Sequence, residues 1–345
     1  MQRSDVLIVG AGIMGVSTAY ALSRAGRNVT LLEQFRLGHD RGSSHGKSRI
    51  FRFSYPDTSY VEMGIESLAL WRELEEEGGV HILEQAGGFD VGAGIESNAA
   101  ALEACGASAE IITGRQAAAR WPLVRFPDEG PVLFSPDSGW TDAELAVRTF
   151  TDLARARGSV LNEGRRIVEI APSDEGVDIH SLDGSWSADV VVVTAGAWVR
   201  KLVGPLGIDV PVHVTRESPV FFRQAGHAPT LVEWGGELLR YALPDPDHGL
   251  KAAEHMVGPI VDPDDDGGAD PASIERVTKW VSERFPSADP APVEAQTCFY
   301  TTTDDERFIL ERHGRVVVGS PCSGHGFKFA PLIGRRLAVL AEEAL

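Results

Sequence analysis

Cysteine is scarce in this chain of 345 residues, which has only Cys105, Cys298 and Cys322. So small and odd a set cannot build a disulfide framework, which indicates a reducing compartment, and we expect a cytoplasmic protein. Long apolar runs are lacking too, because no segment reaches the roughly 18–20 apolar residues that a membrane-spanning helix requires. The short apolar run at residues 6–9 has neither the basic flank nor the cleavage site of a secretory signal peptide.

Basic side chains are outnumbered as well. The 32 lysines and arginines stand against 50 acidic residues, and the formal net charge is −18. The average field of such a protein repels nucleic acid and anionic membranes, so we expect neither as a partner. A small anionic ligand is still allowed, because a local pocket can be positive inside an acidic shell.

Two motifs begin like known sites but do not complete them. Residues 41–48 approach a phosphate-binding P-loop, but Arg41 replaces its first glycine. Residues 262–267 begin like a calcium-binding loop, but the twelfth position is Ser273 instead of glutamate, so a solvated acidic turn is expected. No cysteine and histidine pattern completes a zinc site, and we expect no bound metal.

The start of the chain predicts a strand–helix–strand unit. Residues 5–9 form an apolar strand, an amphipathic helix follows to about residue 25, and residues 28–33 form a second strand. Residues 189–196 are apolar on both faces, as in a strand buried in a parallel sheet. Further helices are predicted at residues 60–77 and 142–157. These elements indicate a Rossmann-like α/β domain.

A different pattern fills much of the remaining chain. Short strand candidates separated by turn residues occur at 87–91, 214–223, 230–234, 237–243, 250–257 and 293–301. A helix is predicted at 271–285, a core strand at 315–319, and a last helix from about 329. The predicted fold class is therefore α/β, or α+β overall, with a second domain built on a mainly antiparallel sheet. The predicted cofactor domain is discontinuous and comprises residues 1–85, 141–212 and 299–345, and the substrate domain comprises residues 86–140 and 213–298.

A glycine fingerprint follows the first strand. Gly10 permits a tight turn, Gly12 allows the backbone to approach a pyrophosphate, and Gly15 allows the helix to pack closely on the strand. The start of the helix supplies free N–H groups for the phosphates. Glu33 ends the second strand, 18 residues beyond Gly15, where its carboxylate can bind ribose hydroxyls. Glu33 disfavours the 2′-phosphate of NADP, while FAD and NAD both remain possible at this point.

Further motifs decide between these two cofactors. They are GSSHGKSRIFR at residues 42–52, GLK at 249–251 with His255, CFYT at 298–301 followed by Asp304 and Phe308, and SGHGFKF at 323–329. With them, from about residue 4 to residue 340, the chain resembles the monomeric sarcosine oxidase and N-methyltryptophan oxidase group of the D-amino-acid-oxidase-like flavoproteins. The resemblance implies FAD joined covalently to Cys298.

The resemblance also implies a reaction. Enzymes of this group oxidise carboxylate-bearing secondary amines to imines and reduce O2 to H2O2. Residues in catalytic positions are Arg49, Lys251, His255 and Tyr300, and those in substrate-binding positions are Arg52, Tyr241 and Lys328. Lys251 matches a lysine that assists oxygen, and Arg52 and Lys328 match a carboxylate clamp.

The resemblance and the fingerprint together predict which residues hold the cofactor. They are Gly10, Gly12, Ile13, Met14, Gly15, Glu33, Gln34, Ser43, Ser44, His45, Ser48, Arg49, Ile167, Ala195, Gly196, Cys298, Gly324, His325, Gly326 and Lys328. The expected partners are a small amino-acid-like substrate, either N-methylated or cyclic, and O2. We expect a monomer.

Two other functions remain open from the sequence. A dehydrogenase would pass the electrons to a carrier instead of oxygen, although Lys251 disfavours this reading. A flavin-binding subunit of a larger oxidase would have no turnover of its own, and the acidic surface leaves room for a partner chain.

Overall fold

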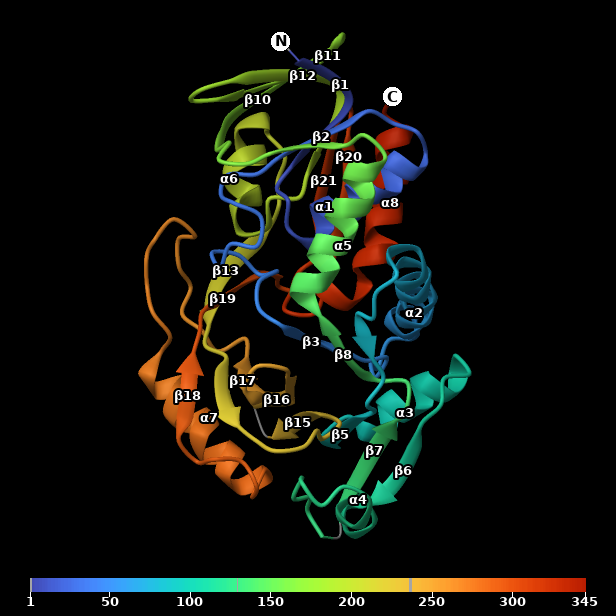
Figure 1. Ribbon diagram of the computed structural model, residues 1–345, viewed down its shortest axis with the longest axis vertical. Helices are drawn as coiled ribbons and strands as arrows, with labels where there is room; N and C mark the ends of the chain where they lie inside the picture. Colours follow the sequence, from blue (N-terminus) through green and yellow to red (C-terminus); the bar gives the residue numbers. More distant parts are fainter. Residues whose placement is uncertain (1, 129, 236–237) are drawn as a thin grey trace.

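A parallel sheet forms one half of the molecule, the upper half in Figure 1. The computed structural model describes residues 2–128, 130–235 and 238–345. In spatial order the parallel strands are β9 (Val160–Asn162), β2 (Val29–Leu32), β1 (Gln2–Val9), β12 (Ser185–Val193) and β21 (Val316–Ser320). The sheet is extended by the antiparallel strands β10 (Ile167–Ser173), β11 (Gly176–Ser181) and β20 (Ile309–His313).

Helices cover this sheet and seal its core. They are α1 (Ile13–Arg24), α2 (Thr58–Gly78), α5 (Ala143–Ala156), α6 (Val199–Val203) and α8 (Ala330–Glu342), with short 3₁₀ turns at Gly196–Trp198, Gly204–Leu206 and Phe327–Phe329. Residues 190–193 of β12 are completely buried, as the apolar run predicts. The predicted strand–helix–strand unit is therefore confirmed, and the ends of its elements shift by a few residues at most. Asp142 caps α5 by accepting the Leu145 N–H at 2.9 Å.

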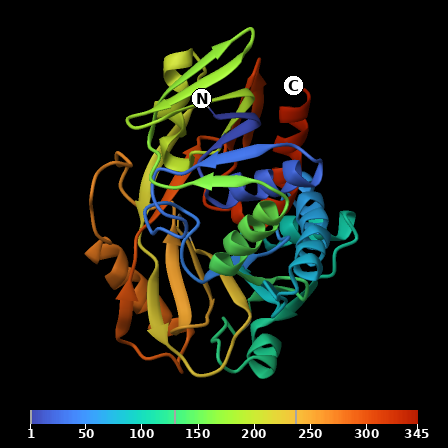
Figure 2. The ribbon, with the colours of Figure 1, turned by 45° about the horizontal axis from the view of Figure 1, so that its top comes forward.

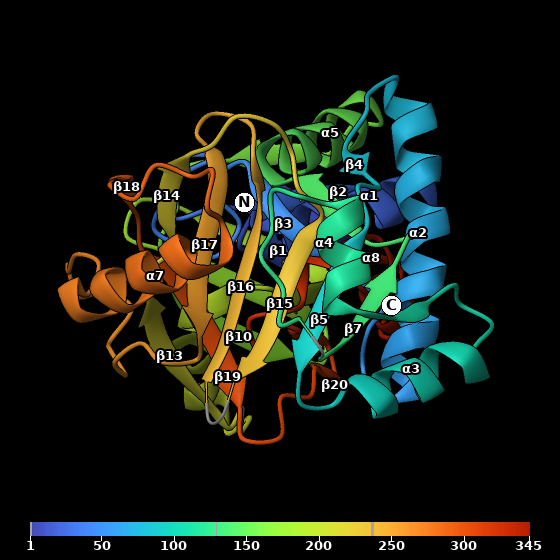
Figure 3. The same cartoon turned by 90° about the horizontal axis from the view of Figure 1, so that it is seen from below.

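A second, mainly antiparallel sheet forms the other half (Figure 3). In the described residues its order is β18 (Pro292–Ala295), β14 (Val220–Arg223), β17 (Gly249–His255), β16 (Leu238–Asp245), β15 (Thr230–Gly235), β5 (Gly88–Gly92), β7 (Pro131–Ser135) and β6 (Glu110–Thr113). Only the β15–β5 pair is parallel in that part of the chain. The associated helices are α3 (Ile95–Ala104), α4 (Gly114–Arg120) and α7 (Pro271–Arg284). Glu237, the first residue of one predicted strand, lies outside the described residues.

Two small ladders lie between the sheets. One pairs β13 (Val212–Glu217) with β19 (Cys298–Thr303), and the other contains β3 (Ser48–Phe51), β8 (Gly139–Asp142) and β4 (Leu83–Glu84). Figure 2 shows the chain running between the two halves through these segments. The division into a cofactor domain and a substrate domain stays a prediction.

The single strands predicted at 214–223 and 293–301 are wrong, because each is broken in two. β13 pairs with β19 and β14 pairs with β18, so the two breaks lie opposite each other. Pro219 lies in the first break and has no N–H to donate to a ladder. The break directs the chain from one sheet into another, and it sets Cys298 at the beginning of β19.

No helix in the described ranges combines the length and the apolar character that crossing a bilayer would require.

Candidate active site

A cavity of about 1060 Å³ takes its walls from both sheets and both small ladders. Every residue predicted to contact cofactor or substrate lines it, with the exception of Gly15. Segments from residue 9 to residue 328 thus converge on one space, which is large by the standard of small-molecule sites.

The turn between β1 and α1 leaves its backbone open to this cavity. A Cβ on Gly15 would lie 1.9 Å from the Gly10 carbonyl oxygen, so Gly15 is required for packing instead of ligand contact. Apart from its neighbours in the chain, the only described group within 4 Å of a Cβ on Gly12 would be the Ser44 hydroxyl, at 3.2 Å. Gly12 therefore borders free space at the start of α1, where a pyrophosphate can meet the N–H groups of the helix.

Glu33 is buried at the end of β2 and lines the cavity. Its carboxylate accepts the Ala11 N–H at 2.8 Å and the Phe35 N–H at 2.9 Å. These bonds tie the glycine turn to the loop after β2, and each carboxylate oxygen keeps acceptor capacity for a ribose hydroxyl.

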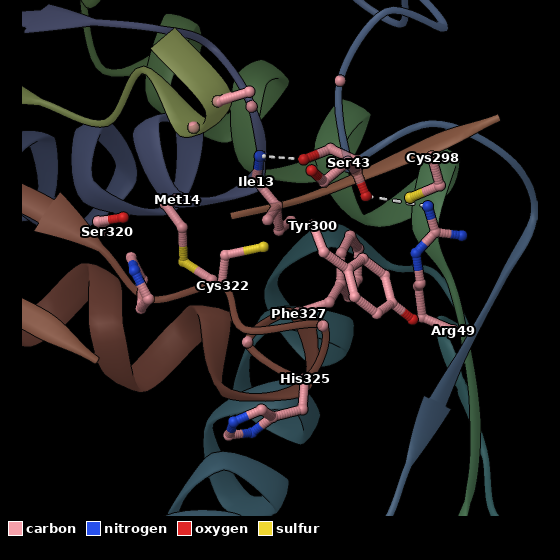
Figure 4. A pocket seen from close by; sticks show the side chains of 18 of the residues that line it. Ile13, Met14, Ser43, Arg49, Cys298, Tyr300, Ser320, Cys322, His325 and Phe327 are labelled. Carbon is pink, nitrogen blue, oxygen red and sulfur yellow. Dashed lines mark hydrogen bonds between the residues drawn. The ribbon is translucent and has the colours of Figure 1, made fainter. Parts of the chain in front are cut away.

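The loop before β3 is held by Arg49. Its guanidinium donates to the carbonyl oxygens of Ser43 and Ser48, each at 2.9 Å, and also to that of His45. The Ser44 hydroxyl in turn accepts the Ile13 N–H at the start of α1, at 3.0 Å. Figure 4 shows Ser43, Arg49 and Cys298 close together on one side of the pocket. Arg49 thus orders the loop and also places positive charge at the cavity wall.

His45 has a buried polar atom that no group in the described part of the chain satisfies. Its Nε2 is buried without a hydrogen-bond partner in the structure, and the residue lines the cavity. Burial, assisted by Arg49 and Lys251, lowers the pKa of His45 to about 3. A neutral imidazole with an unused nitrogen fits a wall that receives a polar ligand.

Cys298 and Lys251 lie on this side of the cavity as well. Burial raises the pKa of the Cys298 thiol, while Arg49 and Lys251 oppose the rise. Lys251 is only 6% exposed and donates to the Ser48 carbonyl oxygen at 3.1 Å. Its pKa falls to about 7 through burial and then the positive charge of Arg49.

Two more cations form another part of the wall. Arg52 donates to the Ser54 carbonyl oxygen, and its guanidinium carbon lies 4.5 Å from the centre of the Tyr55 ring. Lys328 is 4% exposed and donates to the Tyr55 hydroxyl at 2.9 Å and to the His325 carbonyl oxygen at 2.8 Å. Burial, and next the charge of Arg52, hold the pKa of Lys328 well below its usual range.

Aromatic residues complete this part of the cavity. The hydroxyls of Tyr241 and Tyr300 are 3.5 Å apart, and the His255 ring packs edge-on against Tyr300 at 5.3 Å between centres. Burial lowers the pKa of His255 to about 4, and Arg52 and Lys328 add to this effect. Gly324 permits the arrangement, because a Cβ there would lie 2.4 Å from the Tyr300 ring.

His325 is committed mainly to its protein neighbours. Its Nδ1 lies 3.3 Å from the Tyr55 hydroxyl, and its Nε2 lies 3.2 Å from the Glu306 carbonyl oxygen. The ring packs among Tyr60, Phe308 and Phe329, and in Figure 4 it extends away from Arg49 and Cys298. A direct role for His325 at the cofactor stays a prediction.

Several cavity residues escaped the prediction. Among them are Tyr55, Asn98, Arg166, Lys201, Trp234 and Leu239. Tyr55 could have been suspected, since it follows Arg52 by three residues. The others carry no local signal, because strand pairing and loop packing between distant segments bring them to the cavity.

The acidic turn at residues 262–267, predicted to be solvated, makes hydrogen bonds to the other half of the molecule. Asp264 accepts the Trp198 indole N–H at 2.8 Å, Lys201 at 2.7 Å and Arg166 at 2.9 Å. These three residues come from the other half of the molecule, and two of them are cations at the cavity wall. Among the described residues, no group of three acidic, cysteine or histidine side chains is arranged to hold a metal ion.

The site as a whole fits FAD. The open turn at Gly12, the unsatisfied nitrogen of His45 and the cavity-lining cations supply the backbone, polar and charged contacts that a dinucleotide with two phosphates requires.

Known proteins match the chain over nearly its full length. Human peroxisomal sarcosine oxidase and monomeric sarcosine oxidase from a Bacillus species are each 32% identical, with 98% of this chain and 92% of each relative covered. N-methyl-L-tryptophan oxidase from Yersinia pestis is 30% identical, covering 98% of this chain and 95% of the relative.

A solved structure of NikD, an unusual amino acid oxidase essential for nikkomycin biosynthesis, is also similar. Its TM-score is 0.91 at 26% identity, with 100% of this chain and 95% of that one covered. Glycine oxidase from Geobacillus kaustophilus shares the fold, with a TM-score of 0.86 at 20% identity, 100% of this chain and 96% of that one. Residues 5–340 match the family described as FAD dependent oxidoreductase. The chain therefore belongs to the FAD-dependent oxidoreductase family, within the group of the sarcosine and N-methyltryptophan oxidases.

Proposed function

We propose that this protein oxidises a small secondary amine that carries a carboxylate, either an N-methyl or a cyclic amino acid, with O2 as the oxidant. One observation carries the proposal: Arg52, Lys251 and Lys328 are basic side chains that line one cavity with little exposure to solvent. Fixed cations in a partly dry cavity favour a carboxylate ligand. The relatives named for sarcosine and N-methyltryptophan oxidation support the same class of substrate.

The walls near Gly12, Glu33 and Ser43 would hold the cofactor. When bound, FAD accepts a hydride from the carbon next to the amine nitrogen and transfers the electron pair to O2, which yields H2O2. Gly12 would offer open backbone to its pyrophosphate, Glu33 would offer acceptors to its ribose, and Arg49 would supply positive charge at the cavity wall.

Arg52 and Lys328 would bind the substrate carboxylate. Burial, and next the charge of Arg52, lower the pKa of Lys328 and so disfavour its ammonium form in the empty cavity. A bound carboxylate would favour the ammonium form. The clamp then carries the charge opposite to that of its ligand.

His255, Tyr300 and Tyr241 would orient the amine. The pKa of His255, lowered to about 4, leaves its ring neutral at physiological pH, so the ring can accept a hydrogen bond from the amine N–H without adding positive charge beside it. The amine must be unprotonated to react, because an ammonium group has no lone pair to release. Tyr300 and Tyr241 shape the wall against which the substrate lies.

Lys251 would promote the reaction with oxygen. In its protonated form it holds a positive charge at the cavity wall, fixed by its hydrogen bond to Ser48. Such a charge stabilises the superoxide that forms when O2 takes its first electron.

Covalent attachment of FAD through Cys298 belongs to the proposal. Supporting it are the half-buried position of Cys298 at the start of β19, its place in the cavity wall, and the nearby basic residues Arg49 and Lys251, which favour its thiolate. Acid precipitation of the purified protein tests the link. A yellow pellet supports the thioether, whereas a colourless pellet under a yellow supernatant refutes the attachment and leaves FAD binding intact.

We further propose that the protein works as a monomer in the cytoplasm. None of the three cysteines forms a disulfide, which suits a reducing compartment, and three of the relatives are named monomeric. Size-exclusion chromatography with light scattering tests the oligomeric state.

Peroxide release tests the reaction itself. Purified holoenzyme is supplied in air with N-methyl amino acids, proline, pipecolate and amines that lack a carboxylate. Peroxide from the carboxylate-bearing members alone supports the proposal. Reduction of an added dye without peroxide would replace it with a dehydrogenase, and no turnover of any amine would favour a flavin-binding subunit.

A further inference from the structure

Asp90 is a carboxylate enclosed in the antiparallel sheet behind the cavity. It lies on β5 between the buried residues Phe89 and Val91, and it is 3% exposed. The cavity wall includes Arg52 and Ser54, whereas Asp90 is set behind it. Burial raises the pKa of Asp90, and the nearby Arg52 opposes the rise most strongly, ahead of a hydrogen bond from Ser54.

The carboxylate of Asp90 contacts one end of Arg52. Its Oδ1 lies 3.4 Å from Nη1 of Arg52, and the same Nη1 donates to the Ser54 carbonyl oxygen. The Asn98 side chain donates to the Ser54 hydroxyl at 3.1 Å, which ties this group to α3. One nitrogen of the guanidinium is therefore fully engaged at the back of the site.

The opposite edge of the guanidinium is free. In residues 2–128, 130–235 and 238–345 no acceptor bonds to Nε or Nη2 of Arg52. These two nitrogens lie on the same side of the planar group, so together they can bind both oxygens of one carboxylate. With Nη1 held at the back, this edge is the part of Arg52 left for a ligand in the cavity.

Stability alone does not account for the pair. Taking two charges out of water costs about as much as their attraction returns, so a buried ion pair adds little net stability. The pair does fix a long and flexible side chain in one orientation beside the cavity. Fixing that orientation before the ligand arrives removes part of the entropy cost of binding.

We propose that Asp90 is a positioning residue of the carboxylate site: it holds Nη1 of Arg52, so that the Nε and Nη2 edge faces the substrate carboxylate. This inference rests on the proposed function, because it assumes that Arg52 binds that carboxylate. It adds a residue outside the cavity wall to the determinants of substrate affinity.

Binding of a carboxylate that cannot be oxidised tests the proposal. The holoenzyme is titrated with propionate and with propionamide, and the change in flavin absorbance reports each affinity. Asp90→Asn should weaken propionate binding by about tenfold, or about 1.4 kcal/mol, because the guanidinium of Arg52 is no longer held toward the ligand. The affinity for propionamide should stay unchanged.

A matched variant controls for loss of an acidic residue from this sheet. Glu233 lies on the neighbouring strand β15 and pairs with Arg284 at 2.6 Å and Trp280 at 2.7 Å. Glu233→Gln should bind propionate like the parent protein. Equal propionate affinity in Asp90→Asn and the parent would overturn the role of Asp90. If the parent itself did not prefer propionate to propionamide, the carboxylate site of the proposed function would be wrong instead.

A double-mutant cycle separates positioning from general damage. Arg52→Gln removes the group through which Asp90 acts, so adding Asp90→Asn to it should change propionate affinity less than twofold. The double variant also leaves no unpaired buried charge, which protects its folding if Asp90→Asn alone is unstable. An equal loss of affinity from Asp90→Asn with and without Arg52 would overturn the proposal.

Discussion

At the scale of single residues, burial sets the protonation of the side chains around the cavity. Lys251 and Lys328 are both buried, and the pKa of each lies below that of an exposed lysine. The same effect keeps His255 neutral. The residue types and their spacing could be predicted from the sequence, but these protonation states could not, because they depend on burial that only the assembled fold creates.

Lys251 is expected to act on the oxygen step in particular. Lys251→Met should slow the reaction of the reduced enzyme with O2 by on the order of 10²-fold, because the fixed positive charge is lost, and it should change reduction by the amine far less. Stopped-flow measurement of the two half-reactions checks this. Lys279→Met, on the exposed face of α7, is the control. Equal slowing of both half-reactions would contradict the oxygen role.

The oxygen step should also depend on pH through Lys251. Burial lowers the pKa of Lys251 to about 7, so the side chain is cationic below that pH and neutral above it. The rate constant for reoxidation should therefore fall as pH rises through about 7, and it should be flat over the same range in Lys251→Met. A variant with the parent's pH profile would show that another group titrates.

At the scale of elements, the β1–α1–β2 unit is the part of the fold that local sequence determines best. Its strands are apolar and its turn is rich in glycine, so pattern and structure agree. The strand predictions at 214–223 and 293–301 failed because both strands cross from one sheet to another, and pattern alone does not show where partners change. The missed cavity residues have the same origin, since Asn98 and Trp234 reach the site only through the packing of α3 and β15.

The glycine turn gives a prediction at this scale. Gly12 has φ −66°, which alanine can adopt, and the added methyl group would meet only the Ser44 hydroxyl. Gly12→Ala should therefore fold with nearly the melting temperature of the FAD-free parent but lose most of its FAD, because the methyl group blocks the approach of the pyrophosphate. The flavin-to-protein absorbance ratio measures this. Gly204→Ala, at φ −56° with open space around it, should keep its FAD. Full FAD content in Gly12→Ala would contradict the placement of the phosphates.

At the scale of the whole molecule, charge is divided between the cavity and the outside. The net charge is −18, yet Arg49, Arg52, Lys251 and Lys328 gather around one cavity. Some of the acidic residues also connect the two halves of the molecule. In the acidic turn at 262–267, Asp264 accepts hydrogen bonds from Trp198, Lys201 and Arg166. The composition could not predict this link, because its partners lie far away in the sequence.

Asp264 is expected to stabilise the joined molecule. Asp264→Asn should lower the free energy of unfolding by about 1 kcal/mol, because the contacts are charged but partly exposed. Asp265→Asn, one residue along the turn, should have little effect. The hydrogen bond between Asp264 and Lys201 is the main reason that the pKa of Asp264 falls to about 2. The stabilisation by Asp264 is therefore present above pH 3.8 and is lost as pH falls toward 2. Thermal unfolding at pH 7 and pH 3 measures both effects, and equal stability of the two variants at pH 7 would contradict the link.

The most direct test of the account follows the flavin through one complete turnover. Holoenzyme is mixed without air with N-methylglycine, a cyclic amino acid such as pipecolate, or the corresponding amide, and O2 is then admitted. The account predicts that the flavin absorbance bleaches with at least one of the two carboxylates and far more slowly with its amide. It also predicts that the colour returns in air with one H2O2 per flavin. Bleaching that is equally fast with the amides, or recovery without peroxide, would contradict it.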